Sequence, residues 1–228
     1  MRRITWIESC PSTSRELSAE APHGAALAAR EQTAGRGQRG NSWEAEPGKN
    51  LTLSLMLRPD GLHASRQFEL SEAVALGVAD FLDSLGLEGV CVKWPNDIYV
   101  GDRKICGILI ENTLGSSGAI LRAVAGIGVN INQTRFRSDA PNPVSVRQLT
   151  GKEYDLEELA EELVARILAR LGRDNHPEYR RRLWRGEGEW PWRDGRGEFR
   201  AAIGEVLPDG RLELGGRLYR FKEVSAVF

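Results

Sequence analysis

The sequence predicts an α+β protein, in which a large N-terminal part holds a central sheet with helices and a small C-terminal part forms an all-β barrel. Strand-like segments are concentrated between residues 51 and 132, and two longer segments carry apolar residues at helical spacing. Short strand-like segments separated by glycine turns follow from about Arg193. The chain of 228 residues exceeds the usual domain of roughly 100 to 150 residues, which favours one large and one small domain.

The first quarter of the chain predicts a strand, a short helix and two further strands. Arg3–Glu8 alternates enough for a strand, and Ser12 or Thr13 then offers an N-cap, with Glu16 placed for a capping box. The apolar segment "GAALAAREQT" fits a helix or a strand, and its position before a glycine-rich loop favours a strand. The segment "NLTLSLMLRP" alternates in the manner of a strand and ends at a proline.

The remaining elements follow from periodicity and turn residues. Phe68–Leu85 has helical spacing and a closing Gly86, whereas "GVCVKWPNDIYV", "RKICGILIEN" and "AILRAVAGIGVNIN" predict three strands, the first two joined at "GDR" as a hairpin. Leu156–Leu171 is strongly periodic, with acidic residues early and arginines late, and is expected to cover one sheet face. Turns at Pro208–Gly210 and Gly215–Gly216 separate the barrel strands.

Composition narrows the classes of function. A formal net charge of -1 gives no overall basic field for nonspecific DNA binding, and no apolar run approaches the roughly 18 residues of a membrane helix, so we expect a cytoplasmic protein. Cys10, Cys91 and Cys106 lack a C-x-x-C pattern and are expected to be buried thiols. The three histidines lack the spacing of metal ligands, so we expect no protein-held metal.

The stretch "GRGQRGNSW", residues 35–43, contains no aliphatic side chain. Its glycines allow positive φ and close approach of the backbone to a ligand, and Arg36 and Arg39 suit a phosphate or a carboxylate. A solvated surface loop has the same composition, so both interpretations stay open on this segment alone. Without a Gly-Lys-Ser/Thr sequence it is not a Walker P-loop.

Two further segments carry polar groups within predicted strands. In "KWPNDIYVGDRKICGILIE", a buried Lys104 would need a bound anion or an internal carboxylate such as Asp97 or Glu111, and Trp94 is expected to belong to the core. In "GIGVNIN", Asn130 and Asn132 lie two residues apart on the same side of a strand. Paired amides suit a nucleobase or ribose, although asparagines also commonly end strands in turns.

These three segments, in this order and spacing, closely resemble the signature of biotin protein ligases. The early "STS" and the C-terminal "FKEVS" also fall where that family has counterparts, so the resemblance covers most of the chain. It implies a mixed central sheet with helices, as in class II aminoacyl-tRNA synthetases and biotin ligases, over residues 1–185. An SH3-like barrel is expected over residues 186–228. Because the ligase-like region begins almost at Met1, we expect the short form without an N-terminal DNA-binding domain.

The resemblance also implies an activity and its residues. The expected reaction activates biotin with ATP and Mg²⁺ to biotinyl-5'-AMP and then biotinylates a lysine of the biotin carboxyl carrier protein of acetyl-CoA carboxylase. No DNA or membrane partner is expected, and the family includes monomers and homodimers. The implied biotin contacts are Ser12, Thr13, Gln32, Gly35, Arg36, Lys104 and Gly107. The implied ATP and adenylate contacts are Arg36, Gln38, Arg39, Trp43, Lys93, Asn96 and Asn130, and the implied catalytic groups are Lys104, Arg36 and Asp97.

The loop departs from the commonest family pattern at Gln38, where many relatives have a second arginine, and at Asn41 and Ser42, which are often basic in relatives. In relatives this loop folds over the adenylate, so we expect weaker closure unless Arg39 substitutes. Three other interpretations stay open: a lipoate or octanoate ligase of the same fold, a non-catalytic binding module, and a nucleic-acid role that rests only on "YRRRLWR", residues 179–185.

Overall fold

The computed structural model describes residues 4–38, 42–137 and 142–227. The first part of the chain contains the following elements in order: β1 (Ile4–Cys10), α1 (Thr13–Glu16), β2 (Ala26–Gln32), β3 (Leu51–Leu57), η2 (Ala64–Arg66), α2 (Phe68–Ser84), β4 (Val90–Lys93), β5 (Asp97–Val100), β6 (Arg103–Leu114), β7 (Ile120–Val129), α3 (Val146–Thr150), α4 (Leu156–Arg170) and α5 (His176–Arg181). No helix in these described ranges is both long and apolar enough to cross a membrane.

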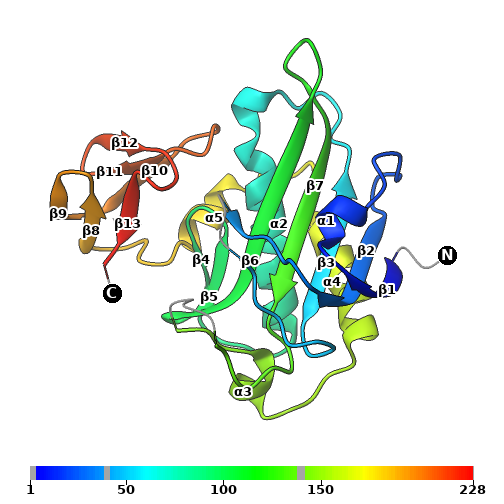
Figure 1. Ribbon diagram of the computed structural model, residues 1–228. Helices are drawn as coiled ribbons and strands as arrows, with labels where there is room; N and C mark the ends of the chain where they lie inside the picture. The colour runs from blue at the N-terminus through cyan, green and yellow to red at the C-terminus, as the bar shows by residue number, and fades with distance from the viewer. Residues whose placement is uncertain (1–3, 39–41, 138–141, 228) are drawn as a thin grey trace.

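Seven strands form one sheet in the order β1-β2-β3-β7-β6-β5-β4, which is the main structure in Figure 1. The sheet is mixed, as expected, because β1 runs parallel to β2 while the other neighbouring strands pair antiparallel. Strand β3, in the interior of the sheet, is buried along its whole length. Its polar residues Thr52 and Ser54 alternate with leucines, so the two faces of the sheet differ in chemistry.

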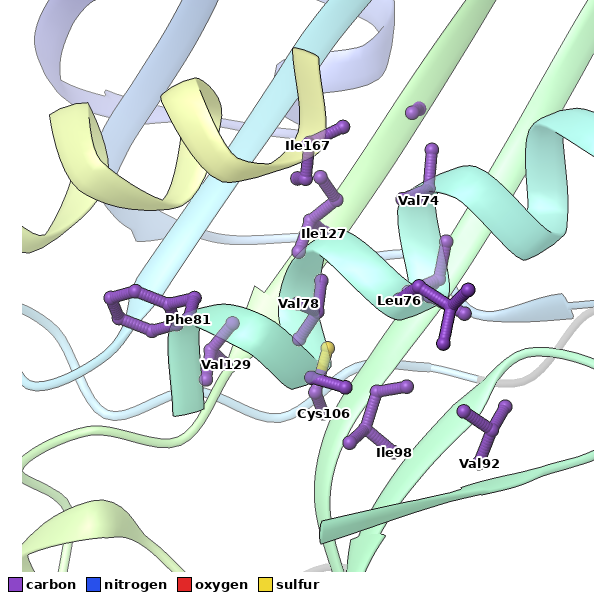
Figure 2. Packing of buried hydrophobic residues seen from close by; sticks show 14 of the residues in the cluster. Val74, Leu76, Val78, Phe81, Val92, Ile98, Cys106, Ile127, Val129 and Ile167 are labelled. Atoms are coloured by element: carbon purple, nitrogen blue, oxygen red, sulfur yellow. The ribbon is translucent and has the colours of Figure 1, made fainter. Parts of the chain in front are cut away.

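Helices α2 and α4 cover one face of this sheet, and the hydrophobic core lies between them and the strands. Figure 2 shows Val78 and Phe81 of α2 beside Val129 of β7, with Ile167 of α4 packing from above. The two helices approach closely at Gly77, where a Cβ atom would lie 2.5 Å from the Cα atom of Ile167. Helix α4 packs mainly on α2 and also reaches β3, which confirms that it belongs to the covering layer.

The C-terminal part consists of two three-stranded sheets, ordered β10-β11-β12 and β13-β8-β9. Their strands are β8 (Trp190–Asp194), β9 (Gly197–Ala201), β10 (Ile203–Val206), β11 (Leu212–Leu214), β12 (Arg217–Tyr219) and β13 (Val224–Ala226). The predicted turns are present, with positive φ at Gly210, Gly215 and Gly216. These sheets agree with the expected SH3-like barrel, although the first strand begins at Trp190 rather than near Arg193.

One histidine connects the two parts of the chain. In α5, His176 places Nδ1 at 2.7 Å from Glu72 Oε1 of α2 and Nε2 at 2.7 Å from Glu205 Oε1 of β10. Burial opposes the positive charge, but the hydrogen bonds to both glutamates raise the pKa of His176 above its usual value. The barrel is therefore tied to the helical layer by a histidine whose positive charge the two glutamates favour.

Three sequence expectations were wrong in detail. The segment "GVCVKWPNDIYV" is not one strand but the antiparallel pair β4 and β5, because Pro95 has no N–H to continue the ladder. Ser12 does cap α1, but its side chain makes no capping hydrogen bond, since its hydroxyl lies 3.2 Å from that of Ser14. All three cysteines are free, and Cys91 is only partly buried.

Candidate active site

A cavity of about 610 Å³ opens on the sheet face opposite the helices. Strands β3, β6 and β7 supply its floor, while the segment after β2 and the segment after β7 supply its sides. Phe221 of the C-terminal part also lines it. The three motifs that are far apart in the sequence therefore meet in one place, as the resemblance implied.

One corner of the cavity is a buried network of neutral polar groups. The Thr13 backbone N–H and hydroxyl both donate to Gln32 Oε1, at 2.8 and 3.1 Å. The same hydroxyl lies 2.8 Å from that of Ser54, which is fully buried on β3. Because these groups hold one another in place, the corner presents a preorganised set of donors and acceptors for an uncharged polar ligand group.

The floor beside this corner is flat because it is built from glycines. Gly107 of β6 and Gly128 of β7 are direct partners across the two strands, and the indole of Trp43 lies over both. A Cβ atom would lie 2.8 Å from Trp43 Cζ3 at Gly107 and 2.5 Å from Trp43 Nε1 at Gly128. Within the described residues the buried indole nitrogen has no hydrogen-bond partner, so its N–H is an unpaired donor at the floor of the cavity.

Two opposite charges face each other at the centre of the cavity. Lys104 Nζ lies 2.8 Å from Asp97 Oδ1, and both side chains are 19% exposed. The two residues come from the paired strands β5 and β6, where a bulge between Ile98 and Tyr99 shifts the register. This is one of the internal ion pairs that the sequence allowed, and it keeps a charged amine inside the cavity.

A second ion pair lies near the cavity wall. Arg36 donates to both carboxylate oxygens of Glu111, at 2.8 and 3.4 Å. The two side chains are 36% and 40% exposed, so the pair is weakly held and open to exchange with a bound anion. Gln38 lines the cavity next to it, whereas Arg39 lies outside the described residues.

The two asparagines have different roles. Asn130 lines the cavity and donates to the Val144 carbonyl at 3.1 Å. Asn132 exchanges two hydrogen bonds with the backbone of Tyr154 and is not part of the cavity lining, so the paired-amide interpretation applies to Asn130 alone. Asn96 lines the cavity from the turn before β5, and its side chain donates to the Ile108 carbonyl.

Two of the expected ligand contacts, Lys93 and Gly35, are not among the residues that line the cavity. Lys93 is not part of the cavity lining; its ammonium lies 5.4 Å from the centre of the Tyr99 ring and 5.9 Å from that of Trp184. Burial lowers its pKa, with Asp97 opposing that effect. Gly35 has a geometric role, because a Cβ atom there would lie 2.6 Å from the Trp43 carbonyl oxygen. The two ends of the loop can therefore approach each other only if residue 35 is glycine.

Several lining residues were missed by the sequence analysis. The cavity also includes Ser54, Gly126, Glu44, Arg137 and Phe221. Ser54 had a signal, because it is a small polar residue in a largely apolar strand, and the glycines of "GIGVNIN" are a second signal, because they permit close approach to the backbone. Phe221 is the first residue of "FKEVS", but that it lines the cavity follows only from the position of the C-terminal part.

No group of three or more histidine, cysteine or acidic side chains arranged to hold a metal ion is found in the part of the chain that the structure describes. The carboxylates that line the cavity are Glu44 and Asp97. Asp97 is paired with Lys104, and Glu44 accepts hydrogen bonds from the backbone of Arg137.

Comparison with known proteins agrees with this geometry. The chain is 37% identical over 153 residues to the bifunctional ligase/repressor BirA of Escherichia coli K12, a match that covers 67% of this chain and 47% of that protein. It is 38% identical over 152 residues to the biotin--[acetyl-CoA-carboxylase] ligase of Paracoccus denitrificans, covering 62% of this chain and 60% of that one. The match to the Escherichia coli relative thus spans about half of its length.

Solved structures show the same fold over the whole chain. The biotin protein ligase of Aquifex aeolicus, in complex with biotin and ATP, superposes with a TM-score of 0.78 at 22% identity, covering 100% of this chain and 96% of that one. The biotin acetyl coenzyme A carboxylase synthetase of Helicobacter pylori, with bound biotinylated ATP, gives 0.61 at 26% identity, covering 95% and 98%. The model of the biotin/lipoate A/B protein ligase family matches residues 6–130, and the chain therefore belongs to that family.

Proposed function

We propose that this protein is an ATP-dependent ligase that converts biotin to biotinyl-5'-AMP and transfers the biotinyl group to a lysine of a biotin carboxyl carrier protein. The observation that carries the proposal is the position of the Lys104–Asp97 ion pair beside a buried neutral polar corner, within a single cavity. The names of the relatives from Paracoccus denitrificans and Helicobacter pylori support the substrate, because both refer to biotin and acetyl-CoA carboxylase.

The two ends of biotin differ in chemistry in the same way as the two regions of the cavity. Its ureido group is neutral and has both donors and acceptors, which suits the corner formed by Ser12, Thr13, Gln32 and Ser54. Its carboxylate needs a cation, and Lys104 and Arg36 are the candidates. Gly107 would let the ligand lie against the backbone of β6, as the resemblance implies.

The first half-reaction brings two anions together. A biotin carboxylate oxygen attacks the α-phosphorus of ATP, a P–O bond forms, and the bond to pyrophosphate breaks. Cationic groups must already be in place because they offset this repulsion as charge develops. Lys104 and Arg36 would exchange their internal partners, Asp97 and Glu111, for the substrates. The adenylate would be bound by Trp43, Asn130, Asn96 and Gln38. Lys93, which does not line the cavity, would support the floor from behind.

Mg²⁺ belongs to the proposal as the ion that accompanies ATP. Mg²⁺ is usually held by substrate phosphates together with one or two carboxylates, and Glu44 and Asp97 provide oxygen atoms of that kind in the cavity. The ion would neutralise part of the triphosphate charge. The protein's own contribution would be to hold the phosphates where Lys104 meets the biotin carboxylate.

The second half-reaction forms an amide bond. The amine of the carrier lysine gives up a proton to solvent and attacks the acyl carbon; the C–N bond forms, the bond between the acyl carbon and the phosphate oxygen breaks, and AMP leaves with that oxygen. Asp97, which Lys104 would release on binding the substrates, would orient that amine. The carrier partner, a cytoplasmic location, the absence of a DNA partner and a monomeric or homodimeric state remain parts of this proposal.

The first test is the exchange of pyrophosphate with ATP by the purified protein in the presence of Mg²⁺. Biotin, lipoate and octanoate would be compared as the acid, and exchange is expected with biotin alone. Exchange with lipoate or octanoate would support the rival ligase, and none with any acid would support the binding module. Lys104→Ala should lower exchange by about 100-fold or more. Lys49→Ala is the matched control, because Lys49 pairs with Glu153 outside the cavity.

A further inference from the structure

The segment that follows β7 is fixed to the segment that follows Trp43. Gln133 Oε1 accepts from the backbone N–H of Glu46 at 2.9 Å, and Gln133 Nε2 lies 3.5 Å from Glu44 Oε1. The Glu44 carboxylate in turn accepts from the backbone N–H of Arg137, at 3.0 and 3.2 Å to its two oxygens. The backbone of Arg137 is thereby held at the cavity, although the side chain itself is not bound by Glu44.

Arg137 differs from the other cations that line the cavity. Arg36 is paired with Glu111, and Lys104 is paired with Asp97. The guanidinium of Arg137 makes no ion pair or side-chain hydrogen bond with any residue in the described ranges, although it lines the same cavity. Binding an anion at Arg137 therefore requires no internal ion pair to be broken.

We propose that Arg137 binds the β- and γ-phosphates of ATP, and the pyrophosphate that they become. This inference rests on the proposed function. The α-phosphate must meet the biotin carboxylate at the partly buried Lys104, so the outer phosphates extend away from it toward the exposed side of the cavity. Arg137 is exposed there, and a guanidinium donates two parallel hydrogen bonds to phosphate oxygens.

The neighbouring hydrogen bonds make this a positioned arginine. Both carboxylate oxygens of Glu44 accept from the backbone N–H of Arg137. Glu44 therefore fixes the position of the Arg137 backbone without forming an ion pair with the guanidinium. Gln133 is 1% exposed and is also bound by Asn50, so the anchor itself is buried. Because the backbone of Arg137 is already fixed, only the rotamers of its side chain remain to be ordered when it binds a ligand.

The test compares Arg137→Ala with Arg135→Ala in the ATP and pyrophosphate exchange assay. Arg135 lies on the same segment but does not line the cavity, so it is a control of equal charge change. The KM for ATP should rise about fivefold in Arg137→Ala, equivalent to about 1 kcal/mol for an exposed charge pair. The KM for biotin should not change, and Arg137→Lys should restore part of the ATP affinity.

A binding measurement separates this inference from the proposed function. Titration calorimetry with inorganic pyrophosphate and with adenosine needs no turnover, so it works even if the protein activates no acid. Arg137→Ala should weaken pyrophosphate binding about fivefold and leave adenosine binding unchanged. Equal pyrophosphate affinity in Arg137→Ala, Arg135→Ala and the unchanged protein would overturn the role of Arg137. Loss of exchange in the unchanged protein would instead contradict the proposed function.

Discussion

The glycine floor leads to a sharp prediction about Gly128. In Gly128→Ala, the new methyl group would lie 2.5 Å from Trp43 Nε1 and 2.8 Å from Cζ2. Carbon and nitrogen atoms normally remain about 3.5 Å apart, so the indole must move away from the sheet by about 1 Å. The strand is held by the sheet and the core, whereas Trp43 lies on a loop, so the loop should move.

The expected consequence is a displaced indole in a folded protein. The free energy of unfolding should change by less than about 1 kcal/mol, because alanine is at least as good as glycine in a strand and Trp43 is only partly buried. If Trp43 binds the adenylate as proposed, a displacement of its indole by about 1 Å should lower the rate of pyrophosphate exchange by up to about 100-fold.

The assay is fluorine NMR of the ligand-free protein labelled with 5-fluorotryptophan, with the Trp43 signal assigned by Trp43→Phe. The control is Gly126→Ala, two residues earlier on the same strand and also in the cavity. There a methyl group would make only ordinary contacts, 3.5 Å from the Leu109 carbonyl oxygen and 3.8 Å from Ser54 Oγ. The Trp43 signal should shift in Gly128→Ala and stay in place in Gly126→Ala. Equal shifts in the two variants would refute the reasoning.

Three further predictions concern the loop, the barrel contact and the helices. Gln38→Arg adds a cation beside the proposed adenylate and should slow release of the adenylate about threefold, measured by quenching samples at successive times; equal release rates in Gln38→Arg and the unchanged protein would contradict the expected weak closure. His176→Ala should lower stability by about 1 kcal/mol at pH 6, discounted for the exposed ring, and this difference from the unchanged protein should shrink as pH rises through the raised pKa of His176, because the neutral ring can donate to only one of the two glutamates; an equal difference at pH 6 and pH 9 would contradict it. Gly77→Ala should lower the free energy of unfolding by about 2 kcal/mol in urea, since its methyl group meets the Ile167 backbone; unchanged stability would show that the helices separate freely.

Most of the fold could be predicted because its signals are local. Alternation predicted β3, the position before the glycine-rich loop favoured β2, periodicity and turn residues predicted β6 and β7, and helical spacing with Gly86 predicted α2 to within one residue at its end. The ordered motifs then indicated which loops meet. The ion pair of Lys104 with Asp97 was among the alternatives for the same reason, since both residues belong to neighbouring strands.

The details that failed depend on backbone geometry that spacing does not show. The bulge between Ile98 and Tyr99 shifts the register of β5 against β6, and Lys104 enters the cavity from this part of β6. Lys93 of β4 lies against aromatic rings instead of lining the cavity. Strand β7 ends at Val129, so the alternation that paired Asn130 with Asn132 no longer applies, and the second asparagine binds the backbone of Tyr154 instead. Such changes of register arise from the whole sheet.

Strand β7 encodes two surfaces in one stretch of sequence. Gly126 and Gly128 line the cavity, whereas the side chains of Ile127 and Val129, between and beside them, belong to the hydrophobic core. Insertion or deletion of a single residue here would turn aliphatic side chains into the cavity and glycines toward the helices. The strand therefore tolerates substitutions better than changes of length. A change of length in this segment would alter the ligand site and the core at the same time.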